Sequence, residues 1–115
     1  MTLAGFSFGS RVGMEVGIKD ARVVNLISIG TPLDKYDFSF LKSLRKPILF
    51  VHGDRDEFGA AEKVRSLATS LPPEARARVE IIKGADHFFE GRLDEMKRVI
   101  TEWIEQQMLT MKDKS

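Results

Sequence analysis

The chain has 115 residues, enough for one domain at most, because domains most often contain about 100–150 residues. The formal net charge is only +1, and basic residues alternate with acidic ones. The sequence therefore gives no electrostatic argument for binding nucleic acid or an anionic membrane. The absence of cysteine excludes disulfides, thiolate catalysis and cysteine-ligated zinc. With no apolar run near the roughly 20 residues of a membrane span and no signal-peptide pattern, we expect a soluble, cytoplasmic protein.

Short apolar runs alternate along the chain with longer helical patterns. Strands are expected at residues 2–6, 22–29, 47–52 and 77–82. Helices are expected at 8–18, at 57–71 and along the apolar stripe from Leu93 to Ile104, with a short helix at 38–44. The strand expected at 47–52 is a continuous apolar run up to His52, as in a strand buried on both faces of a parallel sheet. Alternation of this kind predicts an α/β architecture with crossover helices.

The first helix carries glycine at every fourth position. Gly9, Gly13 and Gly17 recur at the same spacing as the apolar residues of residues 8–18. Each glycine inside a helix costs about 0.5–1 kcal/mol relative to alanine. Close approach of this helix to a sheet is therefore the expected compensation.

Residues 5–9, Gly-Phe-Ser-Phe-Gly, match the pattern G-x-S-x-G. A nucleophilic serine needs this spacing because it sits on a sharp turn between a strand and a helix, flanked by small residues. Such a turn exposes the Ser7 hydroxyl and directs the N–H of Phe8 toward a developing oxyanion. Taken alone, the motif is equally compatible with a simple glycine-rich turn.

Two further groups follow the ends of expected strands. Asp54 and Asp56 come directly after the most apolar strand, where they would either take part in chemistry or cap the next helix. His87 follows the last strand, and a lone histidine is often structural. Because Ser7, an acid and His87 all fall at the same sheet edge, in the order serine, acid, histidine, catalysis is favoured.

Three segments together resemble the signature segments of small bacterial α/β-hydrolases, most closely the lidless, dienelactone-hydrolase-like esterases. They are residues 3–9 (Leu-Ala-Gly-Phe-Ser-Phe-Gly), 48–56 (Ile-Leu-Phe-Val-His-Gly-Asp-Arg-Asp) and 84–89 (Gly-Ala-Asp-His-Phe-Phe). The resemblance implies that residues 1–115 are the C-terminal half of such a domain. It further implies a partial α/β-hydrolase fold with about four parallel strands, the family's fifth to eighth, and without the N-terminal half.

The resemblance also implies roles for individual residues. Ser7 matches the nucleophile, His87 the general base, and Asp56, rather than Asp54, the acid that orients the histidine. Phe8 would supply one oxyanion N–H, and His52 would be a buried residue at the end of a strand. Four phenylalanines near these residues would either line an acyl pocket or pack in the core: Phe6, Phe8, Phe88 and Phe89.

The expected function is that of a serine hydrolase that cleaves small carboxylic esters or thioesters, without a metal or organic cofactor. The second oxyanion N–H of the family comes from a loop in the N-terminal half, and losing one such donor costs about 2.7–4 kcal/mol. An inactive half-domain is therefore the alternative, acting as an assembly or binding module or awaiting a complementary N-terminal half. A nucleotide-binding or response-regulator-like domain has little support, because no glycine-rich phosphate motif is present. The apolar first strand would be a sheet edge, through which the chain is expected to form a homodimer.

Overall fold

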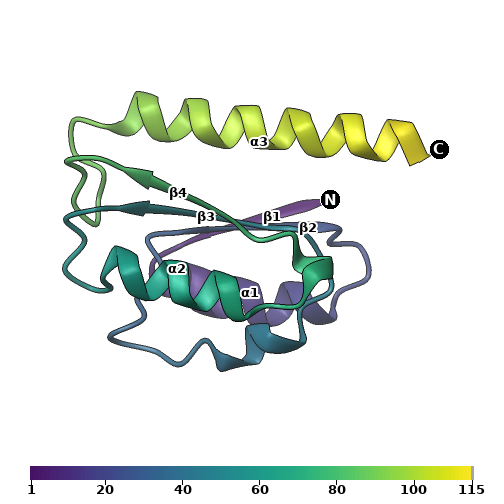
Figure 1. Ribbon diagram of the computed structural model, residues 1–115, viewed down its shortest axis with the longest axis horizontal. Helices are drawn as coiled ribbons and strands as arrows, with labels where there is room; N and C mark the ends of the chain where they lie inside the picture. The colour runs from purple at the N-terminus through teal and green to yellow at the C-terminus, as the bar shows by residue number, and fades with distance from the viewer. Residues whose placement is uncertain (115) are drawn as a thin grey trace.

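The computed structural model describes residues 1–114 and consists of one parallel sheet with helices on both faces (Figure 1). The strands are β1 (Thr2–Phe6), β2 (Asn25–Ile29), β3 (Ile48–Gly53) and β4 (Arg78–Ile82). They lie side by side in chain order, and each neighbouring pair is parallel. The predicted α/β fold with four parallel strands is confirmed.

Parallel strands require crossover connections, and two of the three crossovers here contain an α-helix. Helices α1 (Phe8–Lys19) and α2 (Ala61–Ser70) cover one face of the sheet, and α3 (Leu93–Lys114) covers the other (Figure 1). Two short 3-10 helices, η1 (Ser39–Ser43) and η2 (Pro73–Ala75), lie in the connections that lead to β3 and β4. The expected short helix at 38–44 is thus present as η1. No helix within residues 1–114 is long and apolar enough to cross a bilayer.

Strand β3 lies in the centre of the core and is buried along its whole length. Its alternate side chains enter two hydrophobic clusters, with Phe50 packed on the α1–α2 side and Val51 on the α3 side. Trp103 anchors α3 in the second cluster. The continuous apolar run of the sequence is therefore explained by burial on both faces, as predicted.

Three element boundaries differ from the sequence-based expectation. Strand β2 begins at Asn25, because the N–H of Val23 donates to the carbonyl of Asp20 and closes a turn before it. Helix α2 begins at Ala61 rather than 57, because residues 54–59 form a separate loop at the end of β3. The last helix was expected along the stripe from Leu93 to Ile104, and α3 extends further, to Lys114.

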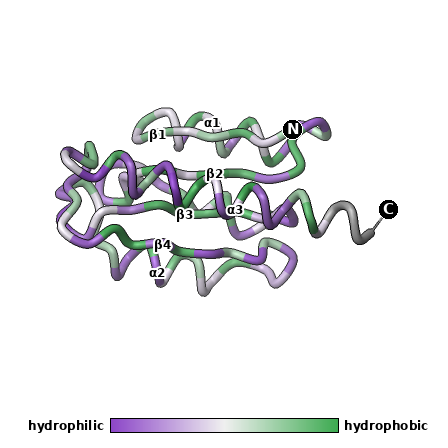
Figure 2. The backbone as a smooth tube through the Cα atoms, turned by 90° about the horizontal axis from the view of Figure 1, so that it is seen from above, coloured by the Kyte–Doolittle hydropathy of each residue, from purple (hydrophilic) through white to green (hydrophobic). Residues whose placement is uncertain are grey.

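Of the glycines in α1, only Gly17 permits the close approach to the sheet that was predicted. A Cβ atom at Gly17 would lie 2.5 Å from a methyl carbon of Leu26 on β2, whereas one at Gly9 would meet no atom within 4 Å. The buried face of α1 is formed by Ser10, Met14 and Gly17. Phe8, Val12 and Val16 lie on the exposed side. β1 is the outer strand of the sheet on the side where α1 lies (Figure 2). In this view, α3 lies over the middle of the sheet and does not cover β1.

Candidate active site

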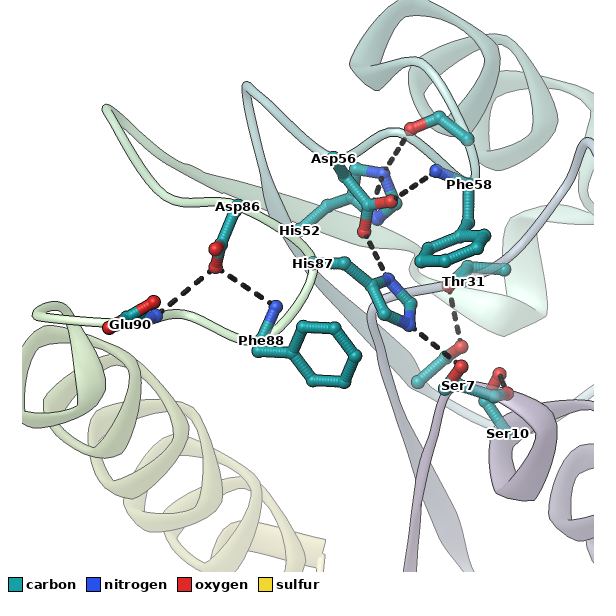
Figure 3. Close-up of polar contacts among 12 residues, drawn as sticks. Ser7, Ser10, Thr31, His52, Asp56, Phe58, Asp86, His87, Phe88 and Glu90 are labelled. Atoms are coloured by element: carbon teal, nitrogen blue, oxygen red, sulfur yellow. Dashed lines mark hydrogen bonds and ion pairs between the residues drawn. The ribbon is translucent and has the colours of Figure 1, made fainter.

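Three loops bring the predicted site residues together at the C-terminal edge of the sheet (Figure 3). Ser7 follows β1, Asp56 follows β3, and His87 follows β4. In open parallel sheets this edge is where functional groups gather. The structure thus joins residues that are 31 and 80 positions apart in the chain.

Ser7 occupies a strained turn between β1 and α1. Its backbone has φ 56° and ψ −122°, a conformation that costs a non-glycine residue on the order of 1–3 kcal/mol. Hydrogen bonds on both sides stabilise this conformation. The Ser7 N–H donates to the carbonyl of Ile29 at 2.9 Å. On the other side, the N–H and hydroxyl of Ser10 donate to the Ser7 carbonyl at 2.9 and 2.6 Å. The sequence motif therefore forms the sharp strand-to-helix turn that was predicted.

His87 links the serine to the acid. Its Nε2 lies 2.7 Å from the Ser7 Oγ, and its Nδ1 lies 2.7 Å from the Oδ2 of Asp56 (Figure 3). Because a carboxylate only accepts hydrogen bonds, Nδ1 carries the proton and Nε2 is the acceptor for the serine hydroxyl. The ring is 1 % exposed. This is the geometry of a serine that can be deprotonated by a histidine oriented by an acid.

Three phenylalanine rings enclose the His87 imidazole. The ring centroids of Phe58, Phe88 and Phe6 lie 4.5, 5.1 and 5.3 Å from that of His87. Phe58 and Phe88 meet the imidazole edge to face. Aromatic walls of this kind fix the ring orientation and keep water away from its faces. Sequence reasoning missed the contact of Phe58, which lies two residues after the acid.

The two acids after β3 have different roles. Asp56 is buried, and its Oδ1 accepts the N–H of Phe58 at 2.8 Å while its Oδ2 faces His87. Asp54 instead accepts the N–H of Gly84 at 2.7 Å and ties the loop after β3 to the loop after β4. Neither acid caps a helix, because α2 begins after Ala60. The structure places Asp56 beside the histidine and Asp54 away from it.

The four phenylalanines that were expected near the site lie in different environments. Phe8 is the first residue of α1, so its N–H lies in the turn where no helix carbonyl accepts it. Its exposed ring contacts Tyr36, with centroids 5.3 Å apart. Phe89 is buried in the cluster beneath α3. Phe6 and Phe88 border a cavity of about 290 Å³, whose lining residues are Phe6, Ile29, Phe88, Phe89, Leu93 and Met96.

His52 is buried at the end of β3, as the sequence predicts, but it also contacts the acid. Its Nε2 lies 2.6 Å from the carbonyl oxygen of Gly59 and 3.6 Å from the Oδ2 of Asp56. Sequence reasoning missed this contact, although the spacing of His52 four residues before Asp56 is visible in the motif. Among the described residues, no three histidine or acidic side chains gather in a way that could hold a metal ion.

The order of the elements and the geometry of the three residues agree with a comparison to known proteins. A family model described as an alpha/beta hydrolase domain matches residues 1–113. The chain belongs to the alpha/beta hydrolase family. A curated relative from this comparison is RP471 of Rickettsia prowazekii, which is 31% identical over 108 residues, covering 89% of this chain and 45% of the relative.

Two solved alpha/beta hydrolase structures resemble this chain over most of its length. A serine hydrolase homologue from Coxiella burnetii is 34% identical with a TM-score of 0.77, covering 88% of this chain and 47% of that one. XC6422 from Xanthomonas campestris, described as a serine hydrolase without a lid, is 26% identical with a TM-score of 0.78, covering 92% and 47%. The chain thus spans about half the length of the proteins it matches.

Proposed function

We propose that this hydrolase chain cleaves carboxylic esters or thioesters through an acyl-enzyme on Ser7. The observation that carries the proposal is the unbroken series of two 2.7 Å hydrogen bonds from the Ser7 hydroxyl through His87 to Asp56. A strained serine, a buried imidazole and a buried carboxylate in this order are what nucleophilic catalysis by serine requires.

The reaction follows from the position of each proton. The Ser7 Oγ attacks the acyl carbon while its proton moves to the Nε2 of His87, and the carbonyl oxygen becomes an oxyanion. Asp56 stabilises the imidazolium that forms. When the tetrahedral intermediate collapses, the bond to the leaving group breaks and His87 returns the proton to the departing oxygen or sulfur. Water then attacks the acyl-enzyme by the same steps, releasing the acid and restoring Ser7.

The proposed donor to the oxyanion is the N–H of Phe8 in the first turn of α1. Helix N-termini favour developing negative charge, so this donor is well placed next to Ser7. A second donor normally contributes about 2.7–4 kcal/mol. We therefore expect measurable nucleophilic reactivity at Ser7 but slow turnover of esters unless a second donor is supplied.

The apolar cavity that Phe6 and Phe88 border favours a small, apolar acyl group. Phe6 precedes Ser7 in the chain, Phe88 follows His87, and both border the cavity of about 290 Å³. This volume is at the lower end of ligand pockets, which are about 300–1,000 Å³. A short hydrocarbon acyl chain fits this space better than a long or charged one.

The proposal is tested by measuring the intact mass of the chain after exposure to a fluorophosphonate probe. Ser7→Ala removes the nucleophile, and Ser43→Ala, at an exposed position of η1, is the matched control. We expect one adduct on the wild type and on Ser43→Ala, and none on Ser7→Ala. No adduct on a wild-type chain shown by circular dichroism to be folded would contradict the proposal and favour an inactive half-domain that serves assembly or binding.

A further inference from the structure

His52 lies behind the acid and takes no part in the steps above. It is on β3, its side chain is fully buried, and its Nδ1 has no hydrogen-bond partner among the described residues. A buried polar atom without a partner costs about 1–3 kcal/mol. An apolar residue would avoid this cost, so the histidine needs a compensating role.

The other ring nitrogen of His52 defines that role. Nε2 lies 2.6 Å from the carbonyl oxygen of Gly59, and a carbonyl oxygen only accepts. Nε2 therefore carries the proton, and Nδ1 is the unprotonated nitrogen. The single N–H of a neutral His52 is directed into the loop that carries Asp56, and it also lies 3.6 Å from the Oδ2 of that acid.

The hydrogen bond to Gly59 closes the acid-bearing loop, residues 54–59. The same loop is held from outside, because the N–H of Asp34 donates to the carbonyl of Phe58 at 3.0 Å. Gly59 itself is tightly packed, since a Cβ atom there would lie 2.8 Å from the carbonyl oxygen of Thr31. The loop is thus fixed between His52 on one side and residues 31–34 on the other.

Asp56 lies in the middle of this closed loop. Its Oδ1 is held by the N–H of Phe58, which leaves Oδ2 to face His87 at 2.7 Å and His52 at 3.6 Å. Among the described residues, His52 is the one side chain that forms a hydrogen bond with Gly59, at the C-terminal end of the loop. Without this bond, that end of the loop has no side-chain hydrogen bond within residues 1–114. A displacement of about 1 Å in a catalytic group can cost about a hundredfold in rate.

We propose that His52 is a positioning residue. By donating its Nε2–H to the carbonyl of Gly59 it closes the loop 54–59, so that the Oδ2 of Asp56 is directed at the Nδ1 of His87. The inference rests on the proposed function in one respect, namely that this alignment serves catalysis. The alignment itself is a property of the folded chain that is measurable without any substrate.

The test compares substitutions that keep or remove the donor. In His52→Gln the amide nitrogen reaches about as far as Nε2 and can still donate to Gly59, whereas His52→Met has similar bulk and no donor. Lys46→Met is the matched control. The ammonium group of Lys46 donates to the carbonyl oxygens of Gly17 and Asp20 at 2.7 and 2.8 Å, and Lys46 precedes β3, so its loss removes a donor to backbone carbonyls at the end of the sheet away from the acid loop.

The first readout is the far-downfield proton NMR resonance of the His87 Nδ1–H that is shared with Asp56, recorded between about pH 5 and 8, where histidines change charge. The second is the rate of fluorophosphonate labelling at Ser7. We expect His52→Met to lose or broaden the resonance and to label at least tenfold more slowly. His52→Gln and Lys46→Met should keep the resonance and label within about threefold of the wild type.

A His52→Met chain with the wild-type resonance and labelling rate would overturn the proposal, because His52 would then act by packing alone. If His52→Met does not fold, His52→Asn replaces it, since its shorter amide cannot reach Gly59. Equal behaviour of the Asn and Gln variants would then overturn the proposal. A wild-type chain that shows the resonance but no labelling would refute the proposed function only, whereas absence of the resonance from the folded wild type would refute the positioning role.

Discussion

Replacing Gly5 with alanine would place a methyl group against the first turn of α1. The added Cβ would lie 2.5 Å from the carbonyl oxygen of Gly9 and 2.8 Å from the Cα of Ser10. Carbon atoms in van der Waals contact are about 3.5–4.0 Å apart, so strand and helix must separate by about 1 Å. Both neighbours are backbone atoms, which cannot move aside by changing a rotamer.

The expected cost is at the upper end of the range for overpacking, which is typically about 1–3 kcal/mol. A loss of about 3 kcal/mol corresponds to a fall in Tm of about 12 °C, at about 4 °C per kcal/mol for a chain of this size. Because Ser7 lies between the two glycines, the same separation should slow its labelling by a fluorophosphonate at least tenfold. Urea denaturation and thermal melting followed by circular dichroism measure the first effect, and intact mass against time measures the second.

The second glycine of the same motif is the matched control. A Cβ atom at Gly9 would meet nothing within 4 Å, and the residue lies inside α1. Gly9→Ala should therefore change the stability by no more than about 0.5 kcal/mol and leave the labelling of Ser7 unchanged. Equal losses of stability in Gly5→Ala and Gly9→Ala would refute the argument that the turn depends on the contact made by Gly5.

Three further substitutions test the different roles of Asp56, Asp54 and Asp20. Asp56→Asn should keep the fold but slow the labelling of Ser7 by up to about 10⁴-fold, because an amide does not hold the histidine in the required tautomer; an unchanged rate would contradict the role of Asp56. Asp54→Ala should cost about 1 kcal/mol in urea denaturation, through one lost hydrogen bond, and leave the labelling rate nearly unchanged; a large fall in rate would reverse the assignment of the two acids. Hydrogen bonds from the side chain and backbone of Arg22 hold the pKa of Asp20 well below its usual range, so this carboxylate stabilises the fold above about pH 4 and loses its contribution as the pH falls. Asp20→Asn should slightly reduce the difference between unfolding free energies measured at about pH 7 and pH 3, the effect being small because Asp20 faces solvent, and an enlarged difference would contradict the sign.

Much of the fold could be predicted because its signals are local. The run 47–51 is apolar at every position, and this pattern depends only on burial of β3 on both faces. The boundaries at residues 22 and 57 were wrong because the deciding contacts are specific. A backbone bond from Val23 to Asp20 delays β2, and residues 54–59 are held as a loop by partners elsewhere in the fold.

The candidate site divides in the same way. Ser7, His87 and an acid after β3 could be expected at one edge because each follows a strand, and a parallel sheet brings those ends together. The preference for Asp56 over Asp54 came from the resemblance to the family. The contacts of His52 with Gly59 and of Phe58 with His87 were missed, because both depend on how a loop folds back over the end of β3. No periodicity in the sequence encodes that path.

The free side of β1 raises the question of what covers it. The strand has one neighbour, β2, and the adjoining helix α1 exposes an apolar stripe of Phe8, Val12 and Val16. Unpaired apolar edges favour pairing with another chain, and two copies related by a twofold axis would pair their β1 strands in antiparallel fashion. We therefore propose that the chain self-associates through β1.

Ala4→Lys places a charge in the middle of this edge, where Ala4 is exposed, and should weaken the association at least tenfold in sedimentation velocity over a range of concentrations. Ser43→Lys adds the same charge at an exposed position of η1 and should leave the association unchanged. A wild-type chain that sediments as a monomer at every concentration would contradict pairing through β1. Association that survives Ala4→Lys would instead place the contact on the exposed stripe of α1, because the apolar side chains of that stripe do not belong to β1.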